Sequence, residues 1–215
     1  MDKRFITILV VIILAIAGLF IFTNKKNSSS GSTTSTNTGV SNHTEGNSSS
    51  KVHLVVYGDF QCSVCEQMYP IETQVLQKYL GQITFTFKHF PLDSAHPNAR
   101  AASRAAEAAG LQGKFFEMHD LLYGNQNLWI NSSNPQTIFD KFATSLSLNI
   151  TKFDADFSSG AVNSTINADY QEGVSKGVDG TPTYFLNGTK LNNENIFSVD
   201  QFSAVIDQAI KNASK

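Results

Sequence analysis

The stretch YGDFQCSVCEQMYP, residues 57–70, holds both cysteines of this 215-residue chain, Cys62 and Cys65. Residues 52–57, which lead into it, are mainly aliphatic and β-branched and predict a buried strand. Beyond Cys65, apolar side chains recur at helical spacing as far as Gly81. The two thiols are therefore expected where a strand ends and a helix begins.

A cysteine pair in that position is suited to redox chemistry. Free backbone N–H groups and the positive end of the helix dipole stabilise a thiolate at Cys62, and such placement lowers a thiol pKa from about 8.5 to roughly 3.5–7.5. Cys65 lies one helical turn further on, faces the same side and can resolve a mixed disulfide. The first thiol is thus the expected nucleophile and the second the expected resolving thiol.

Three other interpretations of the two thiols stay open. Zinc would need further ligands, and the five histidines, at positions 43, 53, 89, 96 and 119, show no paired spacing that would supply them. Copper could be held by the thiolates together with a histidine or methionine. A purely structural bridge would close a loop too short to restrain the unfolded chain much. Redox chemistry is favoured over all three, so we expect no metal and no cofactor.

The first fifty residues differ in composition from the rest. Residues 5–22 carry no charge and would span about 27 Å as a helix, close to the hydrocarbon thickness of a bilayer. Residues 1–23 are interpreted as an uncleaved single-pass membrane anchor with the N-terminus in the cytoplasm; the alternative is a signal peptide and secretion after cleavage. Residues 24–50 contain one aliphatic side chain, Val40, and are interpreted as a flexible Ser/Thr/Asn linker.

Residues 51–215 are expected to form one α/β domain. An alternating run at residues 83–90 predicts a second strand, parallel to the first, and several helices are expected after it at about residues 92–177. Asn187-Gly188 then predicts the turn of a two-stranded hairpin. Ser198 and Gln201 predict the N-terminal cap of a last helix.

Three motifs in this order resemble a known family. DFQCSVC, FKHFPLDSAHPNARAASRAAEAAGLQGKFFEMHDLLY and GVDGTPTYFLNG are similar to motifs of the DsbA-type thiol-disulfide oxidoreductases of the thioredoxin superfamily. The resemblance implies a thioredoxin-like fold with an inserted helical domain and an active site at Cys62 and Cys65. It also implies a cis proline at Pro182 beside the sulfurs, with Thr181 offering backbone to an extended substrate, and a helix kink at Pro70.

The sequence departs from the family pattern at two places. Ser63-Val64, between the cysteines, matches neither a strongly oxidising nor a reducing member, so either direction of electron flow stays open. The acidic residue that many members bury before the first cysteine is Val56 here. Asp59 is therefore a possible proton relay, or else a cap of the turn before the helix. Other polar or aromatic candidates are interpreted as scaffold, core, or ordinary surface or strand-end charge: Glu66, Lys88, His89, His96, His119 and Trp129.

The leading hypothesis is an oxidase on the extracytoplasmic side of the cell membrane that transfers its Cys62-Cys65 disulfide to exported proteins. A membrane thiol oxidase, or a reductase, would recycle the pair. The alternatives are a disulfide reductase or isomerase, and a copper-binding thiol module without turnover. A formal charge of −2 gives no basic face for nucleic acid.

Overall fold

The computed structural model describes residues 41–214. The expected anchor at residues 1–23 and the expected linker up to residue 40 lie outside these described residues. Within residues 41–214, no helix combines the length and the apolar character needed to cross a membrane.

The described residues form one mixed sheet of five strands in the order β1-β3-β2-β4-β5. Strands β2 and β3 run parallel, and the other neighbouring pairs run antiparallel. Between β2 and β3 lies helix α2, so the expected strand–helix–strand unit with parallel strands is confirmed. The strands are β1 (His43–Gly46), β2 (His53–Gly58), β3 (Thr84–His89), β4 (Thr183–Leu186) and β5 (Thr189–Lys190).

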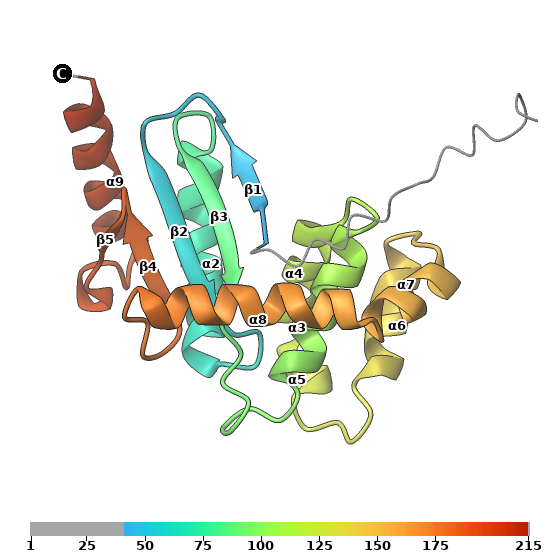
Figure 1. Ribbon diagram of the computed structural model, residues 1–215. Coiled ribbons are helices and arrows are strands. Elements are labelled where there is room, and N and C mark those ends of the chain that lie inside the picture. The colour runs from blue at the N-terminus through green and yellow to red at the C-terminus, as the bar shows by residue number, and fades with distance from the viewer. Residues whose placement is uncertain (1–40, 215) are drawn as a thin grey trace, which may run out of the picture. The chain divides into compact units, whose positions relative to one another are not determined.

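Alternation along β2 supplies both faces of the sheet with apolar side chains. Leu54 and Val56 join the main core cluster, whereas Tyr57 belongs to a second cluster with Phe90 and Phe185. Figure 1 shows α2 (Ser63–Tyr79) behind the sheet and α8 (Gly160–Ser175) crossing in front of it. Helix α9 (Val199–Ala213) packs against α2. Because helices cover both faces of the sheet, the end of β2 is held in place. The start of α2, which follows it directly, is therefore held in place as well.

The helical insertion lies between β3 and β4, as expected. Helix α3 packs against four other helices of the insertion, and its alanine-rich sequence lets them approach closely. Trp129 is fully buried and donates a hydrogen bond from Nε1 to the Leu122 carbonyl, so its interpretation as a core residue is confirmed. The helices are α3 (Ala99–Gly110), α4 (Phe115–Gly124), α5 (Gln126–Trp129), α6 (Gln136–Ser145), α7 (Ile150–Phe157) and α8.

The C-terminal part of the domain also follows the sequence signals. Asn187 and Gly188 have φ values of +50° and +79° and form the turn between β4 and β5. A short 3₁₀ turn, η1 (Asn193–Asn195), follows. The Ser198 side chain accepts a hydrogen bond from the Gln201 amide and caps α9. The predicted hairpin and the N-cap at Ser198 are confirmed. The Gln201 side chain, however, accepts from the Ser198 hydroxyl, so the return bond of a full capping box is not formed with the Ser198 amide.

The boundary of the linker is wrong in the sequence interpretation, because residues 41–50 belong to the fold. Strand β1 pairs antiparallel with β3, and the Asn47 amide donates to the Ile83 carbonyl. Gly46 has a φ of +94°, and a Cβ there would lie 2.4 Å from the Ile83 oxygen. This edge strand is held mainly by backbone pairing and polar side chains, so an argument from low apolar content does not detect it.

Candidate active site

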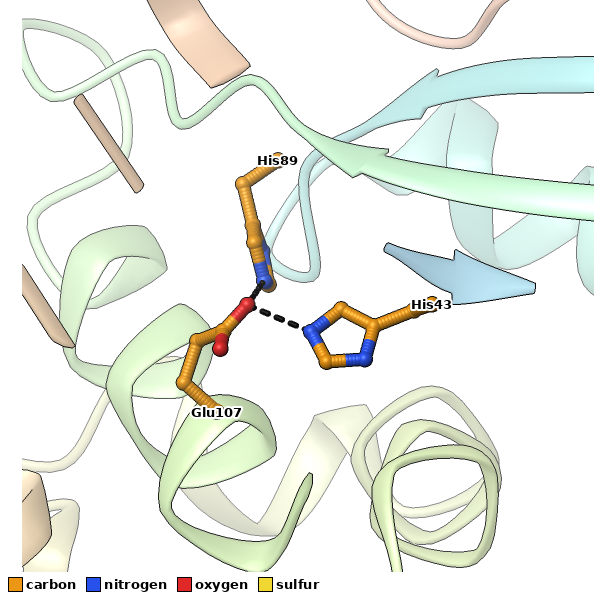
Figure 2. Close-up of side chains that lie close together, drawn as sticks. All are labelled: His43, His89 and Glu107. Carbon is orange, nitrogen blue, oxygen red and sulfur yellow. Dashed lines mark hydrogen bonds and ion pairs between the residues drawn. The ribbon is translucent and has the colours of Figure 1, made fainter. Parts of the chain in front are cut away.

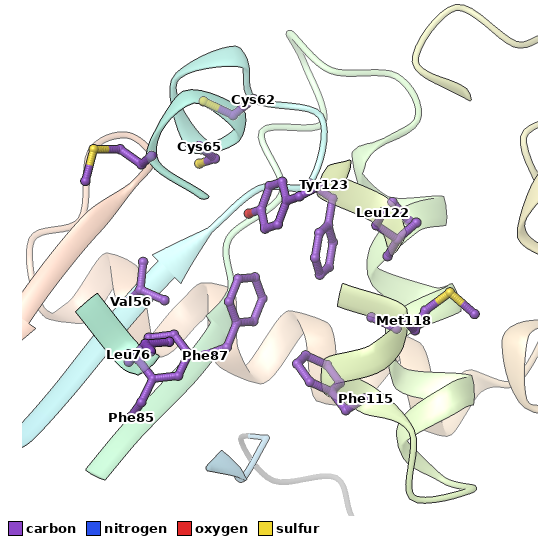
Figure 3. Packing of buried hydrophobic residues seen from close by; sticks show 14 of the residues in the cluster. Val56, Cys62, Cys65, Leu76, Phe85, Phe87, Phe115, Met118, Leu122 and Tyr123 are labelled. Atoms are coloured by element: carbon purple, nitrogen blue, oxygen red, sulfur yellow. The ribbon is translucent and has the colours of Figure 1, made fainter. Parts of the chain in front are cut away.

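Cys62 and Cys65 lie on the first turn of α2 at the end of β2. Cys62 is the N-cap residue with extended backbone, and Cys65 follows within the helix. Both are free thiols, and Figure 3 shows both side chains at the edge of the buried hydrophobic cluster. Relative exposure is 6% for Cys62 and 4% for Cys65, so the expectation that an exposed first thiol precedes a buried second one is wrong in this respect: both are buried. The pair thus lies at the start of α2, as the sequence predicted.

The pKa values of the two thiols are shifted in opposite directions. The pKa of Cys62 is lowered to about 5, chiefly by a hydrogen bond from the Cys65 thiol, with further stabilisation from Thr181 and the Cys65 and Val64 amides. Burial opposes this shift at Cys62. At Cys65 burial dominates and, with the adjacent Cys62, raises the thiol pKa well above its ordinary value. These shifts favour a thiolate at Cys62 and a protonated thiol at Cys65 at neutral pH.

The loop before β4 closes over Cys62. The Thr181-Pro182 peptide bond is cis, as the resemblance implied, and Cys62 in its protonated form donates a hydrogen bond from Sγ to the Thr181 carbonyl, at 3.3 Å. Asn193 Nδ2 donates to the Pro182 carbonyl and fixes the loop from the other side. Within the described part of the chain, the buried Thr181 Oγ1 has no hydrogen-bond partner, which leaves it free to donate to a Cys62 thiolate.

Asp59, the possible relay residue, is fully buried and engaged with three donors. Its carboxylate accepts hydrogen bonds from the Gln61 amide at 2.7 Å and the Leu92 amide at 2.8 Å. His96 Nδ1 lies 2.7 Å from the same carboxylate. These contacts fix the turn that leads into α2 and the loop that follows β3. They match the interpretation of Asp59 as a cap and of His96 as scaffold.

A second buried carboxylate, Glu72, lies closer to the chemistry than sequence reasoning predicted. It shares a cavity of about 10 Å³ with Cys65, and Val56, the residue at the family's acidic position, lines the same cavity. Burial raises the pKa of Glu72 to about 8, while a hydrogen bond from the Tyr184 hydroxyl at 2.9 Å opposes the shift. Glu72 is two helical turns beyond Cys65 on the same face of α2, which is the signal that could have identified it.

Glu72 is only 5% exposed, but it also borders a groove on the outside of the domain. It lines a groove together with Glu45, His119 and Asp120, as well as the internal cavity at Cys65. A cavity of this volume can hold about one water molecule between polar groups. Glu72 thus borders both the cavity at Cys65 and the groove.

The remaining candidates divide between surface and scaffold. Glu66 is exposed on α2, and His119 is buried among aromatic rings, as expected of a surface charge and a structural residue. Pro70 lies inside α2, which continues through it. Lys88 lies next to the end of β3, as expected of a strand-end charge, but its side chain is buried rather than exposed and contacts the Asp169 carboxylate and the Ser41 carbonyl.

Comparisons with known proteins agree with this geometry. A family model described as thioredoxin matches residues 38–208. Among solved structures, BdbD from Bacillus subtilis in its oxidised form superposes with a TM-score of 0.70 at 18% identity, covering 79% of this chain and 93% of that one. Wolbachia pipientis alpha-DsbA1 gives a TM-score of 0.71 at 19% identity, covering 80% and 92%. These likenesses concern the fold.

Two relatives that match the chain in sequence are named as Na(+)/H(+) antiporters. A protein of Salinispora arenicola named Na(+)/H(+) antiporter NhaA 1 is 34% identical over 169 residues, which is 78% of this chain and 24% of that protein. Na(+)/H(+) antiporter NhaA 3 of Salinispora tropica is 32% identical over 171 residues, with 80% and 25% coverage. The chain spans about a quarter of the length of these relatives.

Proposed function

The chain belongs to the thioredoxin family and has the fold of its DsbA-type thiol-disulfide oxidoreductases, and on that premise we propose that it oxidises cysteine pairs of exported proteins. The observation that carries the proposal is the low pKa of Cys62, about 5, beside a Cys65 whose pKa is raised. A stabilised thiolate favours the reduced pair, so the disulfide passes readily to a substrate.

The exchange proceeds in two steps. A substrate thiolate attacks Cys62 Sγ in the Cys62-Cys65 disulfide, which forms a mixed disulfide and releases Cys65 as a thiolate that takes up a proton. The second substrate thiolate then attacks the first substrate sulfur in the mixed disulfide, which forms the substrate disulfide and releases Cys62 as a thiolate. Two electrons pass from the substrate to the pair. A membrane thiol oxidase is the proposed partner that removes them again.

Two neighbouring features support these steps. Glu72, with a pKa of about 8, is largely protonated at neutral pH and can supply the proton that Cys65 takes up through the shared cavity. Thr181 and Pro182 line a cleft with Lys190 and Asn193 beside Cys62. An extended substrate strand could pair with the backbone of this loop.

The direct test is the redox equilibrium of the pair with glutathione, together with disulfide transfer to a reduced protein. A potential near about −120 mV with rapid transfer supports an oxidase, whereas one near about −270 mV favours a reductase. Repair of a scrambled disulfide substrate would favour an isomerase. Tight copper binding by the reduced protein without disulfide transfer would favour the copper-binding module.

The hydroxyl of Thr181 is expected to tune this potential. In Thr181→Val the backbone carbonyl remains, but the thiolate loses one hydrogen-bond donor worth about 1–2 kcal/mol. The Cys62 pKa should therefore rise from about 5 by roughly one unit. The disulfide should become less oxidising by about 20–40 mV. Thiolate absorbance against pH and equilibration with glutathione measure the two effects.

Thr181→Ser is the matched control, because it keeps the hydroxyl and loses only a methyl group. It should keep a pKa near that of the natural chain. Equal pKa values in Thr181→Val and the natural chain would show that the hydroxyl does not reach the thiolate.

The proposed location is the extracytoplasmic face of the cell membrane, with residues 5–22 as the anchor. The uncharged run, preceded by Lys3 and Arg4, supports this placement. We expect membrane fractions of the producing cell to retain the full-length chain, and deletion of residues 1–23 to release the domain. Recovery of the natural chain as a soluble form beginning near Gly18 would show instead that the segment is a cleaved signal peptide.

A further inference from the structure

Three side chains that offer nitrogen and oxygen ligands converge between the sheet and the insertion. His43 comes from β1, His89 from the last position of β3 and Glu107 from the middle of α3. Figure 2 shows both imidazole rings directed at one oxygen of the Glu107 carboxylate. The distances from Glu107 Oε1 are 2.6 Å to His43 Nε2 and 2.8 Å to His89 Nε2.

The ligand atoms lie within reach of a single ion. One ligand atom from each of the three residues falls within 4.8 Å of the others. Around a tetrahedral zinc ion, with bonds of about 2.0–2.1 Å, ligand atoms stand roughly 3.3 Å apart. An ion would therefore need the carboxylate to move away from the two rings by less than about 1 Å, and the two ring nitrogens, which lie within 4.8 Å of each other, to settle about 3.3 Å apart.

The composition of the cluster selects the class of metal. Two imidazoles and one carboxylate suit zinc and similar transition ions, whereas calcium and magnesium prefer oxygen ligands throughout. Three protein ligands also leave one tetrahedral position for water. The set therefore fits a divalent transition metal ion, zinc above all.

Packing orients the ligand side chains, and one side of the cluster remains open to solvent. The His89 side chain is fully buried, and Glu107 is almost so. The His43 ring stacks on Phe115 with ring centroids 3.4 Å apart, which fixes its orientation. The side chain of His43 retains 17% exposure, so an ion can enter from the side of the edge strand.

We propose that His43, His89 and Glu107 form a zinc site that fastens the N-terminal strand to the helical insertion. The site revises the sequence expectation of no metal. Its ligands are far apart in the chain, so no spacing motif could have indicated them. It uses neither cysteine and stands independently of the proposed disulfide chemistry.

The competing explanation is a metal-free triad in which both rings donate hydrogen bonds to the carboxylate. The two explanations differ in what zinc does to the protein. A triad without metal affinity leaves the melting temperature unchanged, whereas a site that binds only the folded chain raises it with zinc concentration. Zinc binding is therefore the property to measure.

The experiment uses the full-length chain with its Cys62-Cys65 disulfide formed, so that no thiolate competes for metal. After chelator treatment, titration with zinc should show one equivalent bound and a rise in melting temperature. His43→Ala and Glu107→Gln should each weaken binding at least tenfold. His53→Ala is the matched control, because His53 is exposed on β2 outside the cluster, and it should bind zinc as the natural chain does.

Cobalt provides a second readout that does not depend on stability. The natural chain should give the intense visible bands of tetrahedral cobalt, and His43→Ala should lose them. The proposal is overturned if the oxidised chain binds no zinc at micromolar concentration. It is equally overturned if His43→Ala binds zinc as tightly as His53→Ala does.

Discussion

Cys62→Ser should abolish disulfide transfer, with a loss of activity on the order of 10³-fold or more, because it removes the sulfur that substrates attack. Cys65→Ser should also stop turnover, but for another reason. It keeps the Cys62 thiolate, which can attack the disulfide of an oxidised protein and form a mixed disulfide with it. It removes the thiol that would attack Cys62 and release that protein, so mixed disulfides with an oxidised protein should accumulate. Oxidation of a reduced substrate protein and non-reducing electrophoresis of the products measure the two outcomes.

Ser63→Ala is the matched control for these variants. Ser63 lies between the cysteines and is exposed, so its replacement should leave transfer close to that of the natural chain. Limited alkylation of the reduced chain at pH 6 should label Cys62 first, since its pKa is about 5 and that of Cys65 is raised. Labelling of Cys65 first, or accumulation of mixed disulfides only in Cys62→Ser, would reverse the assigned roles.

The sequence predicted the elements whose signals are local. Alternation and helical spacing placed β2, α2 and β3, and Asn187-Gly188 placed the hairpin. The cysteine pair was predicted at the start of α2 for the same reason. The cis proline needed a resemblance, because the residues around Pro182 alone do not indicate which isomer forms.

The features that escaped prediction depend on polar contacts between distant residues. Strand β1 contains few apolar side chains, and the Ser41 amide and hydroxyl both donate to Asp169 on α8. Lys88 was interpreted as an ordinary charge, yet the same carboxylate makes its burial tolerable. The pairing of His43 with Glu107 has the same origin. Composition and periodicity report burial of apolar groups and carry no information about such partners.

Glu72 belongs with these unpredicted features, and its protonation should make folding stability depend on pH. The folded pKa is about 8, against 4.5 for an unperturbed carboxyl group, so between these values the folded chain binds more protons than the unfolded chain. The stabilisation linked to Glu72 is complete below pH 4.5 and is lost as the pH rises through about 8. At about 1.4 kcal/mol per pH unit, the loss is at most about 5 kcal/mol.

Glu72→Gln should remove this loss, because an amide has no proton to release. The variant should match the natural chain near pH 4.5 and exceed its free energy of unfolding by several kcal/mol near pH 9, as denaturant titrations at the two pH values would measure. Disulfide transfer at pH 7 should nevertheless slow by about tenfold or more, because the amide cannot protonate Cys65. Glu66→Gln, on the exposed side of α2, is the control and should change neither quantity. Greater stability at pH 9 without slower transfer would keep Glu72 as a buried acid and exclude it as the proton donor. A variant that is stabilised equally at both pH values would contradict the raised pKa itself.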